Sequence, residues 1–224
     1  MTLHTQKYLR LIIPGILLYG LLVVFCWTTD WCSLPIPAAW DEITKLLAAV
    51  VLGVIYHYTG LRELSNGFYH LDVNRSIVEK LTAPFANAIP NINTMTWQKF
   101  RPIFYYFVDH DQSLKVQSDI IRFNGLLWTS IADLRVVAII AIILFASSIV
   151  CSEFLPLPGF PAYRAAIPIV LLTIVFLLTF WFSNVATARH KTLDEEQCDY
   201  ILEHHRDTLE TKLRQLSDRL GRES

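Results

Sequence analysis

Residues 165–185 read AAIPIVLLTIVFLLTFWFSNV, a run without a single charged side chain. A helix needs roughly 20 residues, at about 1.5 Å each, to cross the hydrocarbon core of a bilayer. This segment is therefore long enough to span a membrane unaided. Three further apolar segments accompany it, at Leu11 to Trp27, Ile43 to Thr59 and Val136 to Cys151. These three reach the required length if polar residues at their ends extend toward the headgroups.

Composition points to the same class of protein. The chain of 224 residues is 53% hydrophobic and 17% charged, whereas a soluble domain carries about 45–50% apolar and about 25% charged residues. A net charge of −1 excludes the strongly basic balance of a nucleic-acid-binding protein. We therefore predict an all-α polytopic membrane protein with four transmembrane helices in two hairpins, plus a helical cytoplasmic region.

Basic residues predict the orientation of the spans. All of the 19 Lys and Arg residues except Lys45 and Arg164 lie before the first span, between the second and third, or after the fourth. Basic residues favour the cytoplasmic side of a membrane. The sequence thus predicts that both termini and the long middle segment are cytoplasmic, with the inner membrane of a cell as the location.

The spans divide the chain into four parts. We expect a first transmembrane hairpin at 1–60, a cytoplasmic helical insertion at 61–134, a second hairpin at 135–186 and an amphipathic tail at 187–224. Neither cytoplasmic part alone would bury much core, because domains near 60 residues are already marginal. They are expected to fold against each other or across subunits.

Helical periodicity recurs through the insertion. It predicts a helix over 70–81, a second helix starting near Thr96, and a third stretch over 120–131 that continues into the third span, although Gly125 weakens that continuity. The second helix carries an aromatic stripe, which packs either as core or on the inner leaflet beside basic residues. The stripe consists of Trp97, Phe100, Phe104 and Phe107.

The tail shows a short coiled-coil pattern. Thr192 and Glu195 fit a capping box at its start, and Gly221 is expected to end the helix. Leucines follow heptad spacing, which is typical of a helix that buries one side. The pattern fits an oligomer-forming helix and an intramolecular amphipathic helix equally well. The predicted partner or oligomer contacts are Leu202, Leu209, Leu213, Leu216 and Leu220 in the tail, and Trp97, Phe100 and Phe104 in the insertion.

Motifs for catalysis are absent from the sequence, which contains no zinc-protease motif, phosphate-binding glycine loop or nucleophile elbow. The clusters Asp109-His110-Asp111 and His204-His205 could in principle ligate a metal, but a solvated turn and a charged helix face explain them better. We therefore expect no enzyme activity, cofactor or metal. Cys32 and Cys151 both fall on the predicted outer side and could form a disulfide in an oxidising compartment.

Ionisable residues are missing from the central parts of the first, third and fourth spans, and the second offers only Lys45 and His57 near its ends. Intramembrane ionisable residues normally mark ion or proton pathways, so their scarcity argues against coupled transport. The same scarcity does not argue against a pore formed between subunits, because channels also select with loops and dewetting constrictions.

In size and layout the chain resembles the membrane subunit of the bacterial Kiwa anti-phage system, a small four-span protein that works with a cytosolic DNA-binding partner. The resemblance covers the whole chain as architecture and transfers no functional residue. It implies a membrane protein of phage defence that acts with a soluble partner.

Two functions are therefore expected. The first is a non-enzymatic oligomeric membrane scaffold or sensor that recruits a cytosolic effector to the inner face, in phage defence or an envelope-stress response. The second is an oligomeric ion channel or stress-triggered pore. The expected partners are the lipid bilayer, further copies of the chain and a cytosolic protein, without direct binding of nucleic acid.

Overall fold

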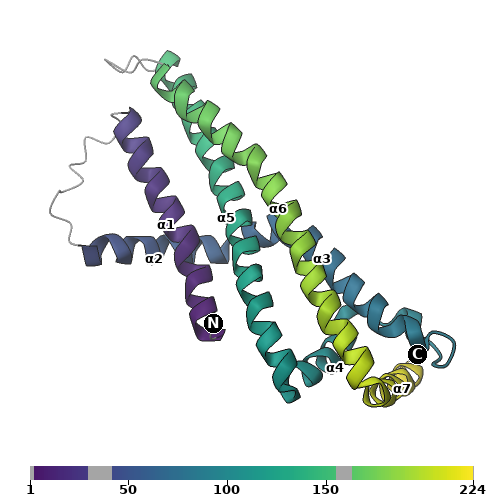
Figure 1. The fold of residues 1–224 in the computed structure, drawn as a ribbon. Helices are drawn as coiled ribbons and strands as arrows, with labels where there is room; N and C mark the ends of the chain where they lie inside the picture. The colour runs from purple at the N-terminus through teal and green to yellow at the C-terminus, as the bar shows by residue number, and fades with distance from the viewer. Residues whose placement is uncertain (1–2, 30–41, 155–162, 224) are drawn as a thin grey trace. The chain divides into compact units, whose positions relative to one another are not determined.

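The computed structural model describes residues 3–29, 42–154 and 163–223, and within these ranges it is helical and contains no strand (Figure 1). The predicted all-α fold is confirmed. The α-helices are α1 (Leu3–Thr29), α2 (Glu42–Tyr58), α3 (Leu61–Thr82), α4 (Trp97–His110), α5 (Gln112–Phe154), α6 (Tyr163–His204) and α7 (Arg206–Glu223), with 3-10 turns η1 (Ala83–Phe85) and η2 (Ile92–Thr94).

Three of these helices, α1, α5 and α6, are long and apolar enough to cross a membrane. The second predicted span takes a different form, because α2 is followed by a bend of 58° and then by the first residues of α3. Gly60 lies at the bend with a φ of +66°, a left-handed conformation that glycine adopts without a steric penalty. The chain thus has three to four helices that could span a bilayer, as expected of a multi-pass membrane protein.

The chain divides into two compact units. The first, which we call the membrane unit, comprises Thr2–Gly67 and Leu126–Val185. The second comprises Phe68–Gly125 and Ala186–Ser224, and we call it the insertion–tail unit. Segments far apart in the sequence build each unit, as expected if the insertion and the tail fold against each other.

Packing in the membrane unit joins α1, α5 and α6 (Figure 1). Its core contains Leu21 of α1, Ala141 and Phe145 of α5, and Ala165 of α6. The rings of Phe25 and Phe145 meet edge to face with centroids 5.2 Å apart. Much of α6 has no protein cover, since only 11% of its most apolar window is buried in the described chain. Lipid or another protein must cover that surface.

Two glycines let α1 and α2 cross at close range. A Cβ atom added to Gly15 would lie 1.8 Å from the carbonyl oxygen of Ala49, and one added to Gly53 would lie 2.1 Å from the carbonyl oxygen of Leu11. Small residues permit such close backbone approach between membrane helices. Gly15 and Gly53 therefore serve the crossing of α1 and α2 within one chain.

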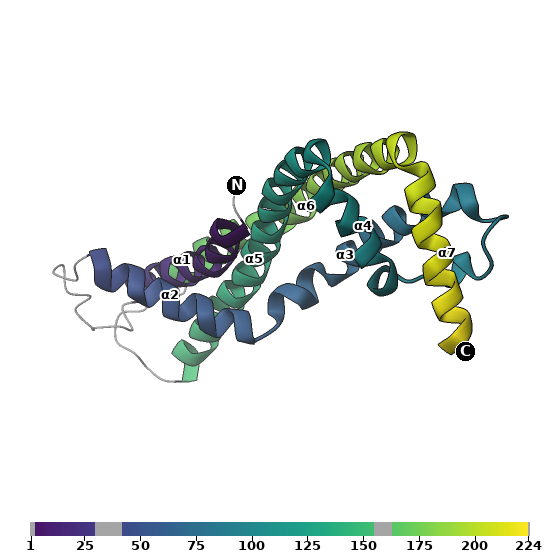
Figure 2. The ribbon, with the colours of Figure 1, turned by 90° about the horizontal axis from the view of Figure 1, so that it is seen from below.

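The insertion–tail unit has an aromatic and aliphatic interior. Phe100, Phe104 and Phe107 of α4 are buried, and so are Leu209 and Leu213 of α7, which packs against α4 (Figure 2). Of the two predicted roles for the aromatic stripe, core packing is therefore the one observed for its three phenylalanines. The tail helix buries these two leucines within its own chain.

Of three local expectations, one is confirmed and two are wrong. Helix α5 continues through Gly125 into the third span, as the apolar spacing predicts. The capping box at Thr192 and the helix end at Gly221 are wrong. Helix α6 runs through Thr192, whose hydroxyl donates to the carbonyl oxygen of Ala188 instead of capping a new helix, and α7 continues to Glu223. The break between α6 and α7 lies at His205.

Candidate functional site: a buried ion pair and its neighbours

An ion pair between Arg62 and Asp133 lies inside the membrane unit. Arg62 is the second residue of α3, and Asp133 projects from α5. Arg62 Nε donates to Asp133 Oδ1 at 2.7 Å and Nη2 donates to Oδ2 at 2.7 Å. Asp133 is 1% exposed and the Arg62 side chain is 12% exposed. This two-pronged contact is the strongest geometry available to a guanidinium and a carboxylate.

Two more helices converge on the pair. The hydroxyl of Tyr56 in α2 donates to Asp133 Oδ1 at 3.0 Å, and Arg62 Nη2 also donates to the backbone carbonyl of Arg10 in α1. Tyr56 is itself 3% exposed. We call Arg10, Tyr56, Arg62 and Asp133 the Arg62 cluster. It connects α1, α2, α3 and α5 through hydrogen bonds.

Arg135, two residues beyond Asp133, forms a second cluster with α6. Its Nε donates to the Thr179 hydroxyl at 3.1 Å, and Nη2 donates to the Thr179 carbonyl at 3.2 Å and to the Ser183 hydroxyl. The guanidinium carbon lies 4.4 Å from the centre of the Phe180 ring, in a cation–π contact. Nη1 donates to the carbonyl of Ser65 at 3.4 Å.

These clusters bring together one end of each apolar segment. Arg10 precedes the first segment, Arg62 follows the second, Asp133 and Arg135 precede the third, and Ser183 lies near the end of the fourth. Because their side chains meet, the same four ends lie at one level of the membrane unit. Helices α1 and α5 therefore run in one direction from this level, and the apolar part of α6 runs toward it.

The chemistry of the Arg62 cluster is suited to stabilising the packing of the helices that it connects. Removing one partner from a buried ion pair leaves a charge without compensation, which costs about 3–5 kcal/mol. Here Oδ1 of Asp133 accepts two hydrogen bonds and Oδ2 accepts one, so both carboxylate oxygens are occupied. Ionisable residues at membrane depth usually have a functional role. Because both carboxylate oxygens already accept hydrogen bonds, the Arg62 cluster is better suited to holding four helices together than to passing protons or ions.

The sequence interpretation missed this site. It placed Arg62 and Asp133 in the cytoplasmic insertion at 61–134 and treated Arg135 as a polar end that extends toward the headgroups. The available signal was the occurrence of oppositely charged residues directly beside two apolar segments. Their pairing could not be read from the sequence because 71 positions separate Arg62 from Asp133.

The predicted contact residues fall into two groups in the insertion–tail unit. Leu209 and Leu213 are 0% exposed, as is Phe100, and Phe104 is 6% exposed. These four side chains belong to the interior of the unit. The other predicted contacts are half-buried and retain accessible surface: Leu202, Leu216, Leu220 and Trp97.

Trp97 lines a cleft of about 890 Å³ between α3 and residues 92–98. Val78, Ile92 and Met95 are buried lining residues, while Leu71 is 71% exposed. The volume falls in the range of about 300–1,000 Å³ that ligand sites occupy.

One residue from each of the two candidate metal clusters takes part in a direct contact. His205 Nε2 lies 2.9 Å from Asp111 Oδ2, and Asp111 Oδ1 accepts the backbone N–H groups of Ser113 and Leu114 at the start of α5. The hydrogen bond with His205 lowers the pKa of Asp111. Among the residues described, no group of three or more His, Cys, Asp or Glu side chains is placed to hold a metal ion. The contact links the α4–α5 junction to the α6–α7 junction.

The predicted disulfide involves a position that the structure leaves undescribed. Cys151 carries a free thiol, and Cys32 lies outside the described residues. Cys26 and Cys198 form no disulfide within the described part of the chain.

No family model, curated protein or solved structure matches the chain.

Proposed function

We propose that this chain is a non-enzymatic membrane scaffold or sensor that holds a soluble effector protein at the inner face of a cell membrane. In this proposal the membrane unit anchors the protein, and the insertion–tail unit is cytoplasmic and binds the effector. The resemblance in layout to the Kiwa membrane subunit suggests phage defence as the process. Self-association through the lipid-exposed surface of α6 completes the proposal.

The cleft beside α3 is the observation that carries this proposal. It combines a buried apolar floor with an exposed leucine at its edge, features that suit a segment of another protein. Burying one leucine side chain contributes about 1.5–3 kcal/mol to a contact. A partner seated on Leu71 would therefore lose roughly ten- to a hundredfold in affinity if that residue became charged.

A comparison of two surface variants tests the proposal. We expect L71E to release the effector from the membrane fraction of the native host and to abolish the biological activity, while the chain itself still inserts. Val116 on α5 is the matched control, because it is 57% exposed in the same unit and does not line the cleft. V116E should retain both the effector and the activity.

Two results would contradict the proposal. One is that L71E keeps the full complement of co-purifying protein and activity. The other is ion flux through liposomes that contain only the purified wild-type chain, together with activity in cells that does not depend on any soluble protein. That second result would favour the oligomeric channel or pore.

A further inference from the structure

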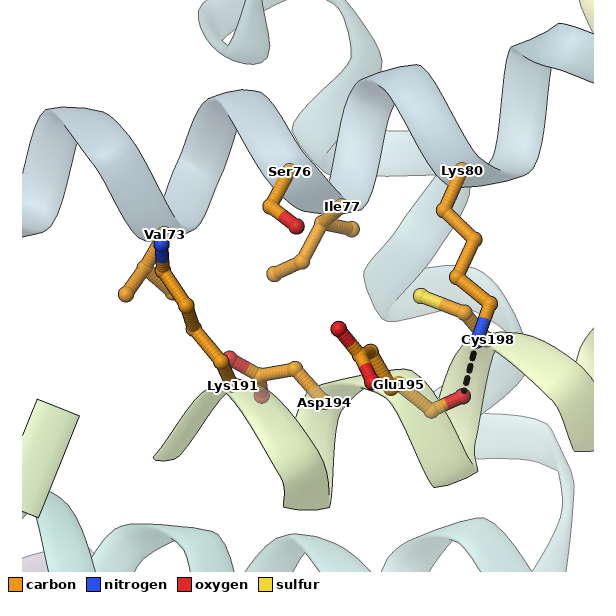
Figure 3. Close-up of a pocket in the computed structure, with 8 residues that line it drawn as sticks. All are labelled: Val73, Ser76, Ile77, Lys80, Lys191, Asp194, Glu195 and Cys198. Carbon is orange, nitrogen blue, oxygen red and sulfur yellow. Dashed lines mark hydrogen bonds between the residues drawn. The ribbon is translucent and has the colours of Figure 1, made fainter. Parts of the chain in front are cut away.

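A buried carboxylate with one oxygen outside any hydrogen bond lies between α3 and α6 in the insertion–tail unit. Asp194 is 5% exposed, and its Oδ2 atom is buried and accepts no hydrogen bond. It projects toward α3 together with Cys198, opposite Val73 and Ile77 (Figure 3). The narrow cleft between the two helices has no space for a water molecule. We call this contact between Val73–Lys80 and Lys191–Cys198 the α3–α6 interface.

The hydrogen bonds around His190, the basic side chain beside Asp194, favour a neutral imidazole. His190 Nε2 lies 3.6 Å from Asp194 Oδ2. The side-chain nitrogen of Asn124 donates to the carbonyl of Ala186 at 3.2 Å and lies 3.1 Å from His190 Nδ1. Because a carbonyl only accepts, the Ala186 contact fixes the amide nitrogen at this position, and Nδ1 must accept its second hydrogen. An imidazole with an accepting nitrogen carries no charge.

Two lysines at the interface are paired with carboxylates, and the cysteine thiol is buried. Lys191 pairs with Asp72 at 2.6 Å, and Lys80 pairs with Asp199 at 2.8 Å. Burial raises the pKa of the Cys198 thiol to about 12, so the thiol stays protonated. Helix α5 contacts this part of α6 through uncharged groups, the Asn124 amide and the Leu114 carbonyl. The ionisable groups that face or flank Asp194 are thus His190, Lys191, Glu195 and Cys198 on α6, and Asp72 and Lys80 on α3.

An ionised Asp194 would be a buried charge with no hydrogen bond to Oδ2, no water and a neutral histidine beside it. Such a group takes up a proton in preference to remaining charged. Consistent with this, burial raises the pKa of Asp194 to about 7. Asp194 lies nine residues beyond Val185, where the apolar part of α6 ends, and so outside the membrane-spanning segment.

We infer that Asp194 is a proton-binding switch, which holds α3 against α6 when it is protonated and loosens that interface when it ionises. The direction follows from linkage between proton binding and opening. The closed interface binds the proton more tightly than an open, solvated one, so acidification favours the closed form. Opening rises about tenfold per pH unit as the pH climbs toward 7, and it levels off above that value. This inference stands independently of the proposed scaffold function.

Amide hydrogen exchange on the full chain in lipid nanodiscs tests the switch. Exchange of residues 72–80 and 191–199, corrected for the intrinsic effect of pH, should rise about tenfold between about pH 6 and about pH 7.5 in the wild type. D194N cannot ionise, and we expect slow exchange at both pH values. An infrared band of a protonated carboxyl at the lower pH, absent from D194N, gives a second readout.

Two control variants identify the titrating group. E195Q removes an exposed carboxylate at the next position and should keep the full pH response. H190Q should keep it as well, because His190 is already neutral. A pH response that persists in D194N, or one that disappears in H190Q while D194N retains it, would overturn the inference. A flat wild-type profile would overturn it too.

Discussion

Replacing Asp133 by Asn should lower the free energy of unfolding by about 3–5 kcal/mol, because Arg62 would keep its charge in a buried site without a counter-charge. The expected loss is large because the pair is bidentate and the carboxylate is 1% exposed. Tyr56 would also lose an ionised acceptor. Unfolding of the full chain in mixed detergent micelles, followed by circular dichroism, measures the change.

A double variant separates the ion pair from simple loss of side-chain volume. R62M/D133L removes both charges together and should be more stable than D133N alone, because no uncompensated charge is left behind. The control pair is Arg75 and Glu79, whose side chains are 79% and 61% exposed. R75Q should leave unfolding unchanged, since solvent screens an exposed pair. If the unfolding midpoint of D133N equals that of the wild type, the Arg62 cluster does not stabilise the membrane unit.

Substituting Gly15 by Ala should separate α1 from α2 and cost about 2–3 kcal/mol, in the range of overpacked interiors. The added Cβ would lie 1.8 Å from the carbonyl oxygen of Ala49, a backbone atom that cannot rotate away. G53A should act in the same way through the carbonyl of Leu11, 2.1 Å from its added Cβ. Disulfide cross-linking between cysteines introduced into α1 and α2 would report the separation directly.

Gly20 provides the matched control on the same helix. A Cβ atom added there meets no atom within 4 Å. Alanine in a helix interior is more favourable than glycine by roughly 0.5–1 kcal/mol, so G20A should be neutral or slightly stabilising. Equal behaviour of G15A and G20A would show that the close crossing is absent in the membrane.

Local pattern was enough to predict the helices and three of the membrane-spanning segments. Hydrophobic length and periodicity are properties of neighbouring residues, and they identified residues 165–185 and the continuous course of α5 through Gly125. The bend at Gly60 was harder to predict. A glycine is compatible with a helix, and the turn is seen only in the structure, in the bend of 58° and in the contacts of Arg62 with α5 and α1.

Residues that depend on distant partners were the ones that sequence interpretation misplaced. In the sequence, Arg62 and Asp133 are two charged residues beside apolar segments, which is typical of a cytoplasmic boundary. Their burial becomes evident only from their pairing. Leu209 and Leu213 have the spacing of an oligomer contact, yet α4 lies close enough to bury them in the same chain. Thr192 matches the local pattern of a helix cap, but it lies inside α6, which begins at Tyr163 and continues to His204.

The proposed function requires that both termini and the insertion lie on the cytoplasmic side of the membrane. Topology reporters test it most directly, fused after Ser224, inserted near Asn91 and inserted near Ala38, each in the full chain. We predict cytoplasmic signals after Ser224 and near Asn91 and an external signal near Ala38, because nearly all basic residues lie beside the first two positions. An external signal near Asn91 would contradict this orientation and the scaffold function with it.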